Sequence, residues 1–112
     1  MTDRPPEPGG KDGTALRALV ADQLPTLVAL RRDLHAHPEL GYAEHRTSAV
    51  IRAWLDAADI PYRAGLAGGT GVVAHLPATD PSDGRRPAVA LRADIDALPI
   101  DEASGAAHAS RL

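Results

Sequence analysis

The sequence contains no cysteine and no phenylalanine, and aromatic residues make up only 3% of its 112 residues. Without cysteine the chain has no disulfide framework, no thiolate metal ligand and no thiolate nucleophile. With so few aromatics, a core has to be built from Leu, Val, Ile and Ala, and Ala buries little area per residue. We therefore expect the chain to fold only marginally on its own.

The sequence also lacks a charge excess of either sign and any long apolar run. Its formal net charge is −3, acids and bases are mixed along the chain, and the arginines form no stripe. This excludes a broad electrostatic reason to bind nucleic acid or an anionic membrane surface. No stretch approaches the ~18 apolar residues of a membrane span, and the N-terminus has no apolar signal region. We expect a soluble, cytoplasmic protein without nucleic-acid or membrane partners.

The first half of the chain is predicted to be a tail followed by two helices. Residues 1–13 are rich in Pro, Gly and charge and are predicted to be a disordered tail, so that the domain spans 14–112. Apolar residues recur at helical spacing from Thr14, a candidate N-cap, up to the boundary set by Pro38. Pro25 either kinks this helix or lies in the first turn of a second one. A second amphipathic helix is predicted over residues 44–58, with Glu44 at its start and Pro61 after its end.

The second half is predicted to supply strands, which makes the chain an incomplete α/β unit. A short extended piece surrounds Tyr62, and "VVAHL" (72–76) is predicted to be a strand because it begins with two β-branched residues. Residues 77–87 have the composition of a loop. "AVALRADID" (88–96) is predicted to be a strand buried on both faces, and residues 101–112 a loop.

The predicted strand 88–96 carries three charged residues at alternate positions. Arg92, Asp94 and Asp96 therefore share one face of the strand. The carboxyl end of a strand is where open α/β sheets place ligand sites, and two carboxylates two residues apart can approach one metal or orient its ligands. Alternatively, Arg92 pairs with one or both acids at a sheet edge. Spacing alone leaves both interpretations open.

Two other patterns are interpreted as structural. The five histidines do not form a ligand motif, and each is read as a structural or solvated side chain; they are His35, His37, His45, His75 and His108. "GTGVVA" (69–74) matches the glycine pattern of dinucleotide-binding loops. That function requires a helix to begin there, whereas two valines and then Pro77 follow, so a turn leading into a strand is predicted.

Three segments in the same order resemble one enzyme family. "LRRDLHAHPELGYAEHRTS" (30–48), "GTGVVAHL" (69–76) and "ALRADIDALPIDEASG" (90–105) are together similar to the N-terminal part of hippurate-hydrolase-like amidohydrolases. This family of aminoacylase/carboxypeptidase-type metallopeptidases includes N-acyl-amino-acid amidohydrolases and auxin-conjugate hydrolases. The resemblance runs from about residue 24 to the last residue.

The resemblance implies a fold and an activity that this chain represents only in part. It implies the beginning of a metallopeptidase-type catalytic domain, with two amphipathic helices followed by at least two strands of a larger central sheet. It also implies a smaller inserted domain that often forms homodimers. The implied activity is hydrolysis of N-acyl amino acids (hippurate-like substrates) at a site with two divalent metals, Mn or Zn. The family's Cys/His metal-binding motif lies beyond Leu112, so no metal ligand is expected here.

Within the resemblance, "RADIDALP" matches the family motif position by position. Asp96 is implied to be an acid that orients metal ligands, whereas Asp94 takes the place of a histidine in the wider clan and its role stays open. We expect the chain by itself to be inactive. The main hypothesis is that the chain is part of a working hydrolase. The alternatives are a remnant without function and a small assembly or binding module.

Overall fold

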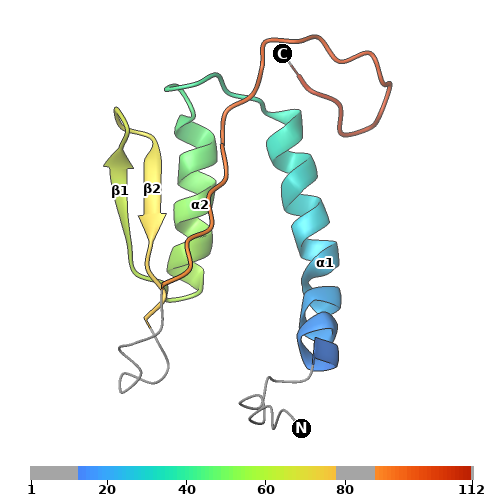
Figure 1. Cartoon of the computed structure of the whole chain (residues 1–112). Coiled ribbons are helices and arrows are strands. Elements are labelled where there is room, and N and C mark those ends of the chain that lie inside the picture. Colours follow the sequence, from blue (N-terminus) through green and yellow to red (C-terminus); the bar gives the residue numbers. More distant parts are fainter. Residues whose placement is uncertain (1–12, 78–87, 112) are drawn as a thin grey trace, which may run out of the picture.

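A computed structural model describes residues 13–77 and 88–111, which form two helices and one two-stranded antiparallel sheet (Figure 1). This agrees with an incomplete α/β domain. Twelve of the thirteen residues predicted as a disordered tail lie outside the described residues. The thirteenth, Gly13, begins the first helix, so the predicted boundary was one residue too late.

Helix α1 spans Gly13–Ala36 and agrees closely with its prediction. It begins one residue before Thr14, and it ends before His37, whose helical conformation is disfavoured by Pro38. The helix continues through Pro25, so this proline does not separate two helices. Neither described helix combines the length and the apolar character that crossing a membrane would require.

Helix α2 (His45–Ala57) packs against a hairpin of strands β1 (Tyr62–Leu66) and β2 (Gly71–Ala74). Strand β2 is shorter than the predicted strand 72–76. The extended piece expected around Tyr62 is its antiparallel partner, with Tyr62 opposite Ala74. Gly68 and Gly69 have φ values of +83° and +128° in the connecting turn. A turn thus leads into a strand, as predicted, and no helix begins at "GTGVVA".

The prediction of a strand over residues 88–96 is wrong for this structure. The backbone there is extended, but it takes no part in a sheet among the described residues. Instead of being buried on both faces, Val89 is 88% exposed and Leu91 is 97% exposed. The composition of the segment favours a strand, but a strand forms only when another strand offers its backbone groups.

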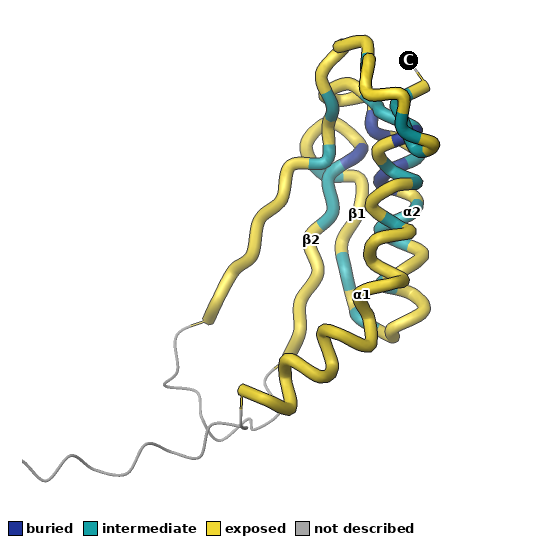
Figure 2. The backbone as a smooth tube through the Cα atoms, turned by 90° about the vertical axis from the view of Figure 1, so that its right-hand side faces the viewer, coloured by how far each residue is buried: buried dark blue, intermediate teal, exposed yellow. Residues whose placement is uncertain are grey.

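The buried residues gather at one end of the molecule, where α1 ends, α2 begins and the hairpin turns (Figure 2). Among the described residues this buried set contains one apolar side chain and four polar ones: Ala36, Glu44, Thr47, Ser48 and Thr70. The structure therefore has a buried polar cluster at one end, and no large side chain of the described residues is fully buried. This distribution supports the expectation of marginal folding.

Candidate functional site

An open groove of about 1020 Å³ lies between the C-terminal part of α1, the first half of α2 and residues 93–102. Apolar side chains from all three segments line it, among them Leu34, Ile51 and Ile95. Polar lining comes from Glu39 and Thr47. The acidic residues predicted from the sequence, Asp94 and Asp96, also line the groove. A groove that combines apolar walls with a few acidic groups is typical of a small-molecule site.

The charged triplet shows features of both interpretations, an ion pair and a position at a groove. Arg92 Nη2 pairs with Asp94 Oδ1 at 2.8 Å, as the structural interpretation expected, although this happens in an extended segment and outside the sheet. The pair is exposed, with side-chain exposures of 87% and 69%, so its contribution to stability is small. Both acids nevertheless line the groove. Their proposed chemical roles stay predictions.

Asp96 lies beside the backbone of the loop between the helices. A Cβ atom added to Gly41 would lie 3.7 Å from Asp96 Oδ2, so a side chain at position 41 would come into ordinary contact with this carboxylate. The neighbouring Ala97 N–H donates to the carbonyl of Glu39 at 2.7 Å. The "RADIDALP" segment is therefore attached to the α1–α2 loop at the residues around Asp96.

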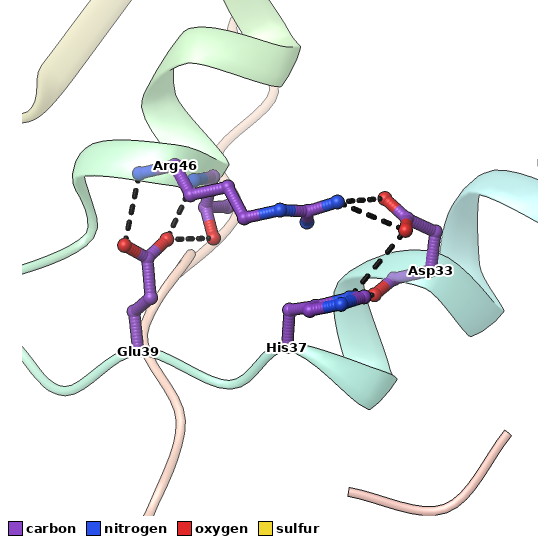
Figure 3. Close-up of polar contacts among 5 residues, drawn as sticks. Asp33, His37, Glu39 and Arg46 are labelled. Carbon is purple, nitrogen blue, oxygen red and sulfur yellow. Dashed lines mark hydrogen bonds and ion pairs between the residues drawn. The ribbon is translucent and has the colours of Figure 1, made fainter. Parts of the chain in front are cut away.

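Glu39 is the residue that holds the start of α2, and the sequence analysis missed this role (Figure 3). Its Oε2 accepts the Arg46 N–H at 2.8 Å. Its Oε1 accepts both the Thr47 N–H at 2.6 Å and the Thr47 hydroxyl at 2.7 Å. Burial raises the pKa of the Glu39 carboxyl, but the hydrogen bonds from Thr47 and the Arg46 amide outweigh it, so the pKa is lowered. Glu39 therefore acts as an N-terminal cap from outside the helix.

Glu44, predicted at the helix start, occupies the N-cap position but makes no side-chain cap hydrogen bond. Its carboxylate accepts the Thr70 hydroxyl at 2.7 Å instead, and both residues are buried. This hydrogen bond from Thr70 is the main reason why the pKa of Glu44 is lowered. The contact fastens the hairpin turn to the start of α2. No spacing rule predicts it, because the two residues are 26 positions apart.

A polar cluster joins the end of α1 to α2 next to Glu39. Arg46 Nη2 donates to both oxygens of Asp33, at 2.9 and 2.8 Å, and His37 Nδ1 lies 2.8 Å from the Asp33 carbonyl (Figure 3). The Arg46–Asp33 pair is a little over two-fifths exposed on each side, so solvent screens it partly. With Glu39, these residues fix the angle between the two helices.

Of the loop predicted over residues 101–112, the described part (101–111) forms a loop and returns to the end of α1 through Glu102. The Glu102 carboxylate accepts the Ser104 hydroxyl at 2.7 Å and the Ser110 N–H at 2.6 Å, and lies 2.7 Å from His35 Nε2. The hydrogen bonds from Ser104, Ser110 and His35, in that order of effect, lower the pKa of Glu102 to about 2. The contact between His35 and Glu102 supports the interpretation of His35 as a structural side chain. Nothing in the local sequence pattern pointed to Glu102.

The described residues do not by themselves fit the two-metal centre that the family resemblance implies. Across residues 13–77 and 88–111, no group of three or more His, Asp or Glu side chains is arranged to hold a metal ion. Asp94 is already paired with Arg92. A two-metal centre needs several converging first-shell ligands, and these two acids are too few to provide them.

Comparison with known proteins finds hydrolases among the proteins to which the chain is similar. It is 44% identical over 86 residues to the IAA-amino acid hydrolase ILR1-like 2 of Arabidopsis thaliana, a match that covers 77% of this chain and 18% of that protein. It is 43% identical over 86 residues to the N-acetylcysteine deacetylase of Bacillus subtilis, covering 77% of this chain and 22% of the relative. It is also 43% identical over 91 residues to the IAA-amino acid hydrolase ILR1-like 6 of Arabidopsis thaliana, covering 81% and 18%.

No family model matches the sequence, and no solved structure matches the chain. Two of these relatives are named as IAA-amino acid hydrolases and the third as a deacetylase. The chain spans about a fifth of their length. By these similarities, the chain belongs to the amidohydrolase family that contains these hydrolases.

Proposed function

We propose that this chain forms one wall of the active site of an amidohydrolase that cleaves the amide bond of N-acyl amino acids. The observation that carries the proposal is the position of "RADIDALP" (92–99). In the structure, its acids line an open groove opposite the start of α2. The named substrates of the relatives, N-acetylcysteine and IAA–amino acid conjugates, suggest the class of substrate.

The acids of the groove are the groups to which we assign a chemical role. Hydrolysis of an amide requires a water molecule held and deprotonated beside the carbonyl carbon. The Ala97 N–H donates to the Glu39 carbonyl, so the chain beside Asp96 is held at the groove, and from there its carboxylate can orient a group that activates water. Asp94 is shared with Arg92 and is assigned a flanking role. The family resemblance implies Mn or Zn, and the tests below include both.

By itself the chain is expected to be inactive. The groove is open to solvent and too few ligands converge on it to hold a catalytic metal pair. Turnover of hippurate or N-acetylcysteine by the purified 112-residue chain, with tight stoichiometric Mn or Zn binding, would contradict this expectation.

A chimeric enzyme tests the proposal directly. The 86 matching residues of the Bacillus subtilis N-acetylcysteine deacetylase are replaced by the matching residues of this chain, and hydrolysis of N-acetylcysteine is measured with added Mn or Zn. We expect activity in the chimera and a loss of at least about a hundredfold in its Asp96→Asn variant, as is typical for removal of a group that positions reacting atoms. An unaffected Asp96→Asn variant in an active chimera would refute the role of Asp96. A folded but inactive chimera would refute the proposed function.

A non-catalytic assembly module is the second candidate, and the exposed apolar side of α1 favours it. This side contains Leu16, Leu19, Val20, Leu24, Leu27 and Val28, which are between 36% and 65% exposed. An uncovered apolar stripe of this length indicates contact with further polypeptide. Cooperative unfolding of the purified chain, combined with an inactive chimera, would support the module over the hydrolase. A chain with no cooperative transition would instead support a remnant.

A further inference from the structure

The backbone of the α1–α2 loop is hydrogen-bonded to the acidic segment. The Glu39 carbonyl accepts the Ala97 N–H at 2.7 Å, and a Cβ atom added to Gly41 would lie 3.7 Å from the Asp96 carboxylate. Ala97 directly follows Asp96, so this hydrogen bond fixes the chain immediately beside the acid. Glu39 and Ala97 are far apart in the sequence, so their hydrogen bond does not follow from local chain geometry. It is a specific feature of the fold.

The side chain of Glu39 makes a second, independent attachment. Its two carboxylate oxygens accept the Arg46 N–H, the Thr47 N–H and the Thr47 hydroxyl, with distances between 2.6 and 2.8 Å. Charge-assisted hydrogen bonds of this kind are short and directional. Glu39 is thus held by its side chain to the first turn of α2 while its carbonyl holds the residue after Asp96.

We propose that Glu39 is a positioning residue for the amidohydrolase reaction, because it fixes Asp96 at the wall of the groove relative to α2. The inference rests on the proposed function. Glu39 and Thr47 line the groove together with Asp96, so a shift of Glu39 moves the acid with respect to the opposite wall. Displacement of a reacting group by about 1 Å can lower a rate about a hundredfold.

The neighbouring Asp33–Arg46 pair provides a matched control. Asp33 also joins α1 to the same turn of α2, through Arg46 Nη2, but its side chain is not part of the groove lining. Weakening this pair loosens the two helices without removing the attachment of Asp96. If Glu39 acted only on stability, Glu39 and Asp33 variants with the same loss of stability would show the same loss of catalytic rate.

The test uses the chimera described above, with Glu39→Gln and Asp33→Asn as the two variants. Gln keeps one oxygen acceptor but turns an NH₂ group towards one of the α2 amides. We expect Glu39→Gln to lower kcat about tenfold or more with KM changed less than about threefold. Asp33→Asn is expected to keep kcat within about twofold. Thr47→Val, which removes the hydroxyl that donates to Glu39 Oε1, should lower kcat several-fold.

Two results in an active chimera would overturn the inference. One is a Glu39→Gln variant with kcat within about twofold of the unsubstituted chimera. The other is a loss of kcat that tracks the fall in unfolding temperature equally in the Glu39 and Asp33 variants, which is the behaviour of a purely structural residue.

A readout without catalysis separates this inference from the proposed function. If the unsubstituted chimera is inactive, the proposed function fails, and the positioning is then measured in the full 112-residue chain by hydrogen exchange at the Ala97 amide. Glu39→Gln is expected to raise its exchange rate about tenfold and Asp33→Asn to leave it nearly unchanged. Equal rates in the two variants would overturn the inference. So would an unprotected Ala97 amide in the unsubstituted chain, because the contact would then not persist.

Discussion

The two ends of α1 differ in what holds them. At its C-terminal end, the helix meets the α1–α2 loop, the hairpin turn and residues 94–111, joined by the carboxylates of Asp33, Glu39, Glu44 and Glu102. Over residues 16–28, the same helix leaves its apolar side uncovered (Figure 2). One end therefore has many directional contacts, and the other has apolar surface without a partner among the described residues.

This difference shows that the contacts that fix the geometry of the chain are not those that supply most of its stability. Hydrogen bonds fix distances and angles, but each contributes only about 0.5–1.5 kcal/mol net. Burial of apolar surface supplies most of the free energy of folding. The chain has the directional contacts that shape one wall of a groove, and little of the apolar burial that would keep this wall folded. The polar end can therefore define a site only when other polypeptide covers the apolar end.

Removal of the Glu39 carboxylate should have the largest effect on the polar end. Glu39→Ala leaves two α2 amides and the Thr47 hydroxyl without their acceptor, and we expect a loss of about 2 kcal/mol in the free energy of unfolding. Urea unfolding followed by the fluorescence of Trp54, the only tryptophan of the chain, measures this loss. Asp22→Ala, an exposed change on α1, is the control. A loss below about 0.5 kcal/mol would show that water replaces the cap.

The Asp33–Arg46 pair should contribute less. A double-mutant cycle with Asp33→Asn and Arg46→Gln is expected to give a coupling of about 0.5 kcal/mol, because solvent screens a pair that is partly exposed. The coupling should shrink further in 1 M salt. A coupling that does not respond to salt would indicate that the pair is more shielded from water than the structure shows.

Acidification should release residues 101–111 from α1, and it should also weaken the start of α2, where hydrogen bonds lower the pKa values of Glu39 and Glu44. The pKa of Glu102 is lower in the folded chain (about 2) than its ordinary value of 4.5, so its contacts add stability above about pH 4.5. This contribution is lost as the pH falls from 4.5 towards 2. An NMR titration of the Glu102 carboxyl carbon, with Glu102→Gln to assign the signal, measures the pKa. A midpoint near 4.5 would mean that these contacts do not form in solution.

Substitutions on the uncovered side of α1 should have the smallest effect in the isolated chain. Leu19→Gln and Leu24→Gln are each expected to change the free energy of unfolding by less than about 0.5 kcal/mol, since both side chains are more than half exposed. In the chimera, where further polypeptide is present, the same changes should cost several times more. A large loss in the isolated chain would show that this side of the helix is already covered there.

The elements that could be predicted from the sequence are those whose causes are local. The spacing of leucines and the position of Pro38 predicted α1 to within one residue at each end, because helical hydrogen bonds connect residues four apart. The hairpin strand was found through its two valines, Val72 and Val73. The strand predicted over 88–96 failed because its stability depends on a partner that no local pattern specifies.

The same distinction holds within the groove. The sequence predicted Asp94 and Asp96, since alternation along an extended segment is a local rule, and the structure places both at the groove. It missed Glu39, because a carboxylate that caps a helix seven and eight residues ahead follows no capping pattern. It placed Glu44 at the start of the helix, as observed, but could not predict that its carboxylate accepts the hydroxyl of the distant Thr70.

The extended segment beginning at residue 88 has a consequence for the solubility of the chain. An extended apolar stretch with free backbone groups is a template on which identical chains can stack. Here the exposed Val89 and Leu91 are followed at once by Arg92, Asp94 and Asp96. Parallel in-register stacking would bring like charges together at each of these three positions, which opposes growth of a fibril. Asp94 and Asp96, which line the groove, and the neighbouring Arg92 would thus also act as gatekeepers against aggregation.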